Sequence, residues 1–278
     1  MLTPDFLIVG AMKAATFTLS RNLTAHPAIF VPHGELHYFS DPATFAKGAA
    51  HYAAHFADAK SHQIIGEKSV PYYFTPEVPA RIHALNPHTK LIWLLRDPVP
   101  RAVSHYWFFV SRGTEDRSLQ EAIRQEQAGE DVRLHARYLY LGQYADHITA
   151  YDAFFPREQM LFLRFEDFVE NPSAGLDHVA RFVGADMTTF RFPNEIHREN
   201  TTRMPLSQPL QVWARRVFRD RAFRVWKTIR EINTALGPAK YPPLDPKLRA
   251  ALYTYFEPYN QRLSDLIGWD MSGWRGTK

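Results

Sequence analysis

Short, continuous apolar runs alternate with longer stretches of helical spacing along the first two thirds of the chain. Uninterrupted apolar runs such as 6–9 and 90–95 are typical of strands that are buried on both faces of a parallel sheet. We expect strands at 6–9, 29–31, 64–66, 90–95 and 160–163, and helices at about 16–25, 78–85, 98–113, 119–127 and 145–155.

The last hundred residues carry helical patterns only, at about 206–236 and 246–267. Strands that alternate with helices predict βαβ units and a mostly parallel sheet with helices on both faces. We therefore expect an α/β fold: one three-layer domain spanning 1–278, with a helical C-terminal part. The most polar stretch, 114–137, is interpreted as a solvated helix and loop insertion.

The composition narrows the class of protein. The chain has 278 residues, 45% of them hydrophobic and 22% charged, which is a globular balance. It has no cysteine, which excludes disulfides, thiolate zinc sites and cysteine nucleophiles. The net charge of +4 favours anionic ligands, but no clustered basic run indicates a nucleic-acid binder. The sequence leaves the oligomeric state open, and a homodimer is one option because closed dimers are the commonest oligomers.

The sequence also bears on location and metals. It shows no signal-peptide pattern, and its longest apolar runs are far below the roughly 20 residues of a membrane span. We therefore expect a cytoplasmic protein without a membrane span. No metal-ligand spacing is present, so no metal is expected.

The loop from Gly10 to Thr16 follows the first strand and opens a helix. Its small residues allow close backbone approach, the helix start offers N–H groups and a positive dipole end, and Lys13 adds a charge. These features predict an anion cradle, although a plain strand–turn–helix connection with a solvated lysine fits the spacing equally well. It is not a Walker loop, because Lys13 sits three residues after Gly10 and no Gly-Lys pair is present.

A second candidate site lies at the end of the 90–95 strand. Arg96 ends that strand, and Ser104 lies about two turns into the next helix. A guanidinium and a hydroxyl together make a good phosphate clamp. For Arg96 alone, a salt bridge to Asp97 is the simpler interpretation.

Taken together, the loop from Gly10 to Thr16 and the segment Arg96-Asp97-Pro98, with Arg101 and Ser104, resemble the two cofactor signatures of PAPS-dependent sulfotransferases. PAPS is 3′-phosphoadenosine 5′-phosphosulfate. The segments 34–39, which includes Glu35 and His37, and 66–69, which includes Lys68, are similar to acceptor-side motifs of the heparan sulfate branch.

The resemblance implies a P-loop-kinase-like sulfotransferase fold and a metal-independent enzyme. Such an enzyme moves the sulfuryl group of PAPS by in-line displacement to an acceptor hydroxyl, most simply for O-sulfation, and releases PAP. The acceptor is a glycan, a glycolipid or a small natural product. Two readings stay open beside it: a P-loop-like nucleoside or sugar kinase, and a non-catalytic protein that binds a phosphoadenosine.

The resemblance also assigns roles. Lys13 stabilises the leaving phosphate and Lys68 approaches the sulfuryl group. The base is Glu35 or His37; the heparan sulfate branch favours Glu35, which leaves His37 as a hydrogen-bonding group for the acceptor. Two loop positions depart from the family pattern. Ala15 replaces glycine, which is tolerable if its φ stays negative, and Phe17 replaces Ser or Thr, so the cradle relies on backbone N–H groups and on Thr16 or Thr18. The cofactor-binding residues are Lys13, Ala14, Ala15, Thr16, Phe17, Thr18, Arg96, Ser104 and Arg203.

Overall fold

The computed structural model describes residues 2–130, 136–193, 204–238 and 240–275. The chain folds as two compact units: the first comprises 1–97, 144–199 and 265–268, and the second 98–143, 200–264 and 269–278. The expectation of one domain over 1–278 stays a prediction.

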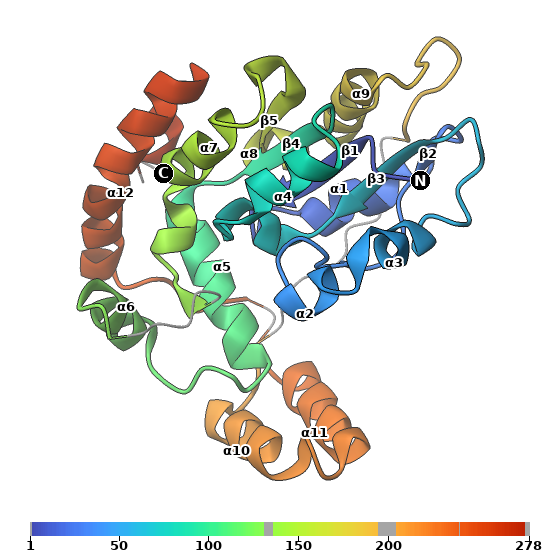
Figure 1. Cartoon of the computed structure of the whole chain (residues 1–278). Helices are drawn as coiled ribbons and strands as arrows, with labels where there is room; N and C mark the ends of the chain where they lie inside the picture. Colours follow the sequence, from blue (N-terminus) through green and yellow to red (C-terminus); the bar gives the residue numbers. More distant parts are fainter. Residues whose placement is uncertain (1, 131–135, 194–203, 239, 276–278) are drawn as a thin grey trace. The chain divides into compact units, whose positions relative to one another are not determined.

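A five-stranded sheet forms the centre of the first unit (Figure 1). Its order is β2-β3-β1-β4-β5, and every adjacent pair is parallel. The predicted α/β class with a parallel sheet is confirmed. The central strand β1 is fully buried, as its uninterrupted apolar run predicts. The strands are β1 (Phe6–Gly10), β2 (Ile29–Phe30), β3 (Ile64–Lys68), β4 (Lys90–Leu95) and β5 (Met160–Arg164).

Helices connect the strands of the first unit. Of these, α2, α3, α8 and α9 have no counterpart among the predicted elements. The sequence does carry signals for α9. Asn171 caps the helix by accepting the N–H of Ala174 (3.2 Å), and the regularly spaced Leu176, Val179 and Val183 are buried on one face. The elements are α1 (Thr16–Leu23), α2 (Pro42–Phe45), α3 (Gly48–Ala54), the 3₁₀ segment η1 (Val70–Phe74), α4 (Val78–Leu85), α7 (Tyr144–Asp152), α8 (Phe165–Glu170) and α9 (Pro172–Val183).

The described part of the second unit is helical, which confirms the predicted helical C-terminal part. The expected pattern over 206–236 is two helices rather than one, because the chain reverses at 219–222 and the halves pack together. Asn233 ties them by donating to the carbonyl of Ser207 (2.8 Å) and to Oε1 of Gln211 (2.7 Å). The helices are α5 (Pro98–Ser111), α6 (Leu119–Gln127), α10 (Gln208–Phe218), α11 (Phe223–Ala235) and most of α12 (Pro246–Ile267).

A buried carboxyl group lies in the core of the first unit, near the end of β3. Glu67 is fully buried and accepts hydrogen bonds from three hydroxyls: Tyr52, Ser69 (2.6 Å) and Tyr72 (2.8 Å). Two of these hydroxyls also accept backbone N–H groups of the loop after β2, Ser69 from His37 (3.0 Å) and Tyr72 from Phe39 (3.3 Å). Glu67 therefore connects the β3 end to that loop.

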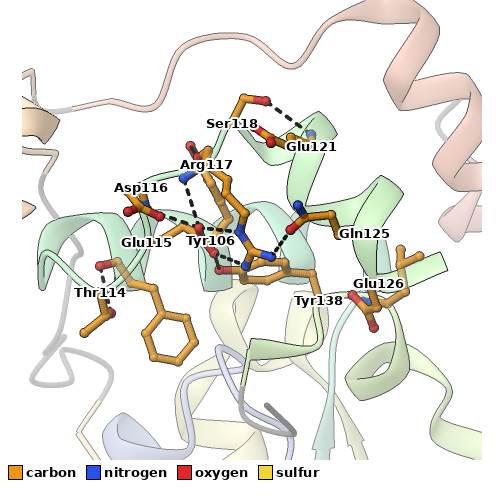
Figure 2. Close-up of polar contacts among 12 residues, drawn as sticks. Tyr106, Thr114, Glu115, Asp116, Arg117, Ser118, Glu121, Gln125, Glu126 and Tyr138 are labelled. Carbon is orange, nitrogen blue, oxygen red and sulfur yellow. Dashed lines mark hydrogen bonds and ion pairs between the residues drawn. The ribbon is translucent and has the colours of Figure 1, made fainter. Parts of the chain in front are cut away.

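In the described part of the polar stretch 114–137, a buried network surrounds Glu115, so the interpretation as a solvated insertion is wrong at the start of the stretch, whereas 127–130 are exposed. Figure 2 shows the arrangement. The Arg117 guanidinium donates to both oxygens of buried Glu115 (2.9 and 2.8 Å) and to Oε1 of Gln125 (2.6 Å). The Tyr138 hydroxyl donates to Glu115 at 2.7 Å. The polar sequence of the segment predicts exposure, but the hydrogen bonds that Glu115 and Arg117 make allow this charged pair to be buried.

We predict that Glu67 makes stability fall as the pH rises. Burial raises the pKa of the Glu67 carboxyl above its ordinary 4.5, against the lowering effect of hydrogen bonds from Ser69, Tyr52 and Tyr72. The stability that the protonated group contributes is complete below pH 4.5 and is lost as the pH rises through the folded-state pKa. The expected loss is about 1.4 kcal/mol per unit of pKa shift.

Urea denaturation of the wild type and Glu67→Gln across this range measures the effect. As the pH rises, the unfolding free energy of the wild type should fall relative to that of Glu67→Gln. The exposed control Glu158→Gln should show no such trend. A flat difference for Glu67→Gln would contradict the prediction.

The opposite pH dependence is expected for Glu115. Burial opposes ionisation of Glu115, but hydrogen bonds from Arg117 and Tyr138 outweigh it and hold the pKa below 4.5. Its stabilisation is present above pH 4.5 and disappears as the pH falls through the folded-state pKa. Glu115→Gln should lower the unfolding free energy at neutral pH by about 2–3 kcal/mol, and this cost should shrink on acidification. Asp116→Asn, which affects only an exposed pair with Arg216, should cost less than about 0.5 kcal/mol.

Candidate active site

Three loops and the end of one strand, all at one edge of the sheet, carry the charged residues that the sequence singles out. Because the strands are parallel, the loops after β1, β2, β3 and β4 all leave the carboxyl edge, where α/β sheets bind ligands. The loops after β1, β2 and β4 carry Lys13, Glu35 with His37, and Arg96, while Lys68 is the last residue of β3; all belong to the first unit.

The β1–α1 loop turns through two left-handed residues, Lys13 (φ 70°) and Ala15 (φ 62°). The condition that would make alanine tolerable at 15, a negative φ, is not met, because Ala15 takes the conformation that glycine adopts without cost. Helix α1 begins at Thr16, and its start has no side-chain cap. Its first N–H groups are therefore available to an anionic ligand. Ala14, Thr16 and Thr18 are buried beneath the loop.

Glu35, on the loop after β2, forms an ion pair with Lys68 at the end of β3. The Lys68 ammonium donates to Glu35 Oε1 at 2.5 Å. The other carboxylate oxygen accepts the N–H of Val70 at 3.3 Å. Lys68 is almost completely buried, while the Glu35 side chain keeps 26% of its exposure. A carboxylate that is held in place and still reaches solvent can accept a proton from a bound hydroxyl.

His37 lies beside Glu35, but not because the segment is extended. An extended segment would place residues two apart on the same side, but here the chain turns and His37 has a φ of 53°. Its Nε2 lies 3.6 Å from Glu35 Oε2 and the ring is about half exposed. The bond from its N–H to Ser69, which in turn donates to Glu67, holds the backbone there.

Phe17 contributes a ring where a hydroxyl is the family pattern. The Lys68 ammonium lies 5.1 Å from the centre of this ring, within the range of a cation–π contact. The ring therefore provides an apolar wall for Lys68, which narrows the directions in which the ammonium can point.

Arg96 lies against the β1–α1 loop. Its Nη1 donates to the carbonyl of Lys13 at 3.0 Å, and its guanidinium carbon lies 4.4 Å from the Phe165 ring centre. The Tyr144 hydroxyl donates to the Arg96 carbonyl at 2.8 Å. Arg96 thus ties strand β4 to the loop that carries Lys13.

For two predicted cofactor residues, a place at this edge stays a prediction. Ser104 is buried on α5 in the second unit, and its pairing with Arg96 stays a prediction. Arg203 lies outside the described residues.

Residue-by-residue reasoning missed Glu67, Phe165 and Tyr144 as positioning residues. Glu67 sits inside a motif that was noted for Lys68, and a carboxylate amid apolar strand residues is the signal that could have found it. Phe165 and Tyr144 act through contacts between segments far apart in the chain, which spacing does not reveal.

The groups at this edge suit a ligand with phosphate groups. They comprise an uncapped helix start, Lys13, Arg96 and the small side chains of the loop. Across the described ranges, no group of three or more His, Cys, Asp or Glu side chains could hold a metal ion.

Comparison with known proteins agrees with the resemblance in the sequence. The model of the family described as "Sulfotransferase domain" matches residues 3–221. Heparan sulfate glucosamine 3-O-sulfotransferase 3B1 of Mus musculus is 33% identical over 65% of this chain and 46% of its own length. Heparan sulfate glucosamine 3-O-sulfotransferase 6 of Homo sapiens is 28% identical over 98% of this chain and 73% of its own. The chain thus spans less than half of the mouse relative.

Solved structures show the same fold. The crystal structure of a sulfotransferase from Alicyclobacillus acidocaldarius superposes with a TM-score of 0.75 at 26% identity, covering 99% of this chain and 100% of that one. The sulfotransferase domain of the Synechococcus PCC 7002 olefin synthase reaches 0.51 at 15% identity, over 96% and 95%. The kinase alternative is not favoured by these matches.

The expected cytoplasmic location is wrong on these comparisons, because the matching heparan sulfate 3-O-sulfotransferases are Golgi-lumenal enzymes. A cellular address is read from a short targeting segment by its receptor, so the composition of a folded domain does not encode it. In the described part of the chain, no helix has the length and apolar character to cross a membrane.

The family model matches more than three quarters of the chain, and the resemblance to the heparan sulfate branch agrees with the named relatives. The chain belongs to the sulfotransferase domain family.

Proposed function

We propose that this protein transfers a sulfuryl group from PAPS to a carbohydrate hydroxyl, with Glu35 as the base. The observation that carries the proposal is the Glu35–Lys68 pair at 2.5 Å, beside the loop that holds Lys13. The relatives named above are heparan sulfate glucosamine 3-O-sulfotransferases, which supports a carbohydrate as the acceptor class.

The residues that would hold PAPS fall into two groups. The loop and helix start from Lys13 to Thr18 would bind the 5′-phosphosulfate through backbone N–H groups and the lysine. Arg96, with Ser104 as predicted from the sequence, would bind the 3′-phosphate. Arg203 remains a sequence-based candidate to close over the nucleotide.

Bound PAPS would supply the sulfuryl group and its phosphate leaving group. Glu35 would take the proton of the acceptor hydroxyl while the acceptor oxygen forms its bond to sulfur and the bond from sulfur to the phosphate oxygen breaks. Lys13 would neutralise the charge left on that phosphate oxygen, and Lys68 would stabilise the charge on the sulfuryl oxygens. His37, half exposed beside Glu35, would hydrogen-bond the acceptor.

The two alternatives make different demands on the same site. A P-loop-like kinase needs a lysine directly before the helix hydroxyl, whereas Lys13 stands three residues before Thr16. A protein that only binds a phosphoadenosine would use Lys13 and Arg96, but it has no need of a carboxylate paired to a buried lysine.

We predict that PAP stabilises the protein more than 5′-AMP or ATP does. At about 100 times its dissociation constant, a ligand raises the unfolding free energy by roughly 2.7 kcal/mol. The 3′-phosphate contact should be lost in Arg96→Ala, which should reduce the response to PAP to that of 5′-AMP. Thermal unfolding with each nucleotide measures this.

A larger stabilisation by ATP with Mg²⁺ would indicate a kinase, and no stabilisation by any nucleotide would contradict the proposed donor. Arg157→Ala is the matched control, since this arginine pairs with Asp152 on the surface of the same unit.

We predict that Glu35→Gln lowers kcat by about 10²–10⁴ because it removes the base. The amide keeps the shape of the carboxyl group, so the thermal response to PAP should remain. The measurement is transfer of labelled sulfate from PAPS to a panel of acceptors: a heparan-type polysaccharide, a glycolipid and a phenol.

His37→Asn provides the comparison, because asparagine tolerates the left-handed backbone at this position. Under the proposal it raises KM for the acceptor more than it lowers kcat. The reverse result, with His37→Asn inactive and Glu35→Gln active, would assign the base to His37. Transfer only to non-carbohydrate acceptors would overturn the acceptor class and leave the chemistry standing.

A further inference from the structure

In the second unit, α10 and α11 form a helical hairpin (Figure 1). Several of its large apolar side chains are exposed. On α10, Leu210, Trp213 and Val217 follow one face of the helix, and Trp213 is 52% exposed. On α11, Val225, Ile232 and the capping residue Leu236 do the same, and Leu236 is 66% exposed. We call these six residues the apolar stripes.

The same hairpin is strongly basic. Residues 206–236 hold seven arginines and lysines against two acidic residues, a net charge of +5, whereas the whole chain carries +4. The basic residues are Arg215, Arg216, Arg219, Arg221, Arg224, Lys227 and Arg230. Burial, Arg219 and Arg112 lower the pKa of Arg215. Arg216 pairs with Asp116, and Lys227 and Arg230 share Glu231, so the basic residues still outnumber the carboxylates beside them.

The charges and the apolar stripes occupy different faces. At 100° per residue, Arg224 and Lys227 lie well away from Val225 and Ile232 around α11. The inward faces of the hairpin are occupied by Gln211, Asn233 and the buried ring of Trp226. The apolar stripes are therefore directed away from the contact between the two helices.

We propose that the α10–α11 hairpin binds the surface of a bilayer that contains anionic lipids. A helix with Trp and Leu on one face and Lys and Arg on the other is suited to the boundary between headgroups and acyl chains. The apolar stripes enter the boundary, and the basic side chains remain at headgroup level, where each gains from the negative surface potential.

Charge and apolarity together favour this occupant over two others. A second copy docked through the same hairpin would bring together two hairpins of net charge +5 each, which opposes association. A soluble polyanion would satisfy the arginines but leave Trp213 and Leu236 in water. An anionic bilayer matches both properties. The inference does not depend on the proposed function of the sheet edge.

Vesicle flotation tests the proposal. The protein should float with phosphatidylcholine vesicles that contain about 30% phosphatidylglycerol, and at least about tenfold less with phosphatidylcholine alone. Raising the salt concentration should weaken the binding to the anionic vesicles.

Two variants separate the apolar and charged contributions. The triple variant Leu210→Ser, Trp213→Ser and Val217→Ser removes exposed apolar contacts, and Arg224→Glu with Lys227→Glu removes charge; each should reduce binding at least about tenfold. Phe154→Ser is the matched control, an exposed aromatic residue in the first unit, and should bind like the wild type. Unchanged thermal unfolding temperatures show that the variants are folded.

Several results would overturn the proposal. These are equal binding by the triple variant, equal binding to neutral and anionic vesicles, or binding to dextran sulfate without binding to vesicles. Concentration-dependent dimers in sedimentation that the triple variant abolishes would assign the face to a second copy instead.

Discussion

The arrangement at the sheet edge depends on one buried carboxyl group. Glu67 accepts three hydroxyl hydrogen bonds in a fully buried position, and two of those hydroxyls also hold the loop after β2. Burial of a carboxyl group costs free energy unless its oxygens are hydrogen-bonded. The cluster is therefore stable only when all three hydroxyls reach Glu67. That arrangement also sets the distance between Glu35 on the loop and Lys68 on the strand.

The parallel sheet explains why such different loops meet. Each strand of a parallel sheet ends at the same edge, so residues near positions 13, 35, 68 and 96 become neighbours despite their separation in the chain. Contacts then fix the side chains within this edge: Arg96 to the Lys13 carbonyl, and Lys68 beside the ring of Phe17. The topology of the sheet therefore brings these residues together, and side-chain contacts then fix their orientation.

The second unit uses polar groups differently. Glu115 is buried with a charged partner, Arg117, and stays ionised more readily than usual, whereas Glu67 is surrounded by neutral hydroxyls and protonates more readily. Elsewhere in that unit the α10–α11 hairpin leaves its charges and apolar side chains in solvent. Buried polar groups thus hold segments together in the described part of each unit. The exposed charges of the hairpin are available to other molecules.

The sequence by itself determined the class of fold, most of the strands and helices, and the family. Continuous apolar runs, turn residues and four ordered motifs are local features, and local features can be recognised in the sequence without knowledge of the fold. Only the tertiary structure decided that 206–236 folds back as a hairpin, that Ala15 takes a positive φ, that Phe17 lies against Lys68 and that Glu67 anchors the loop after β2. These depend on contacts between distant segments, whose energies appear only when the chain brings both partners together.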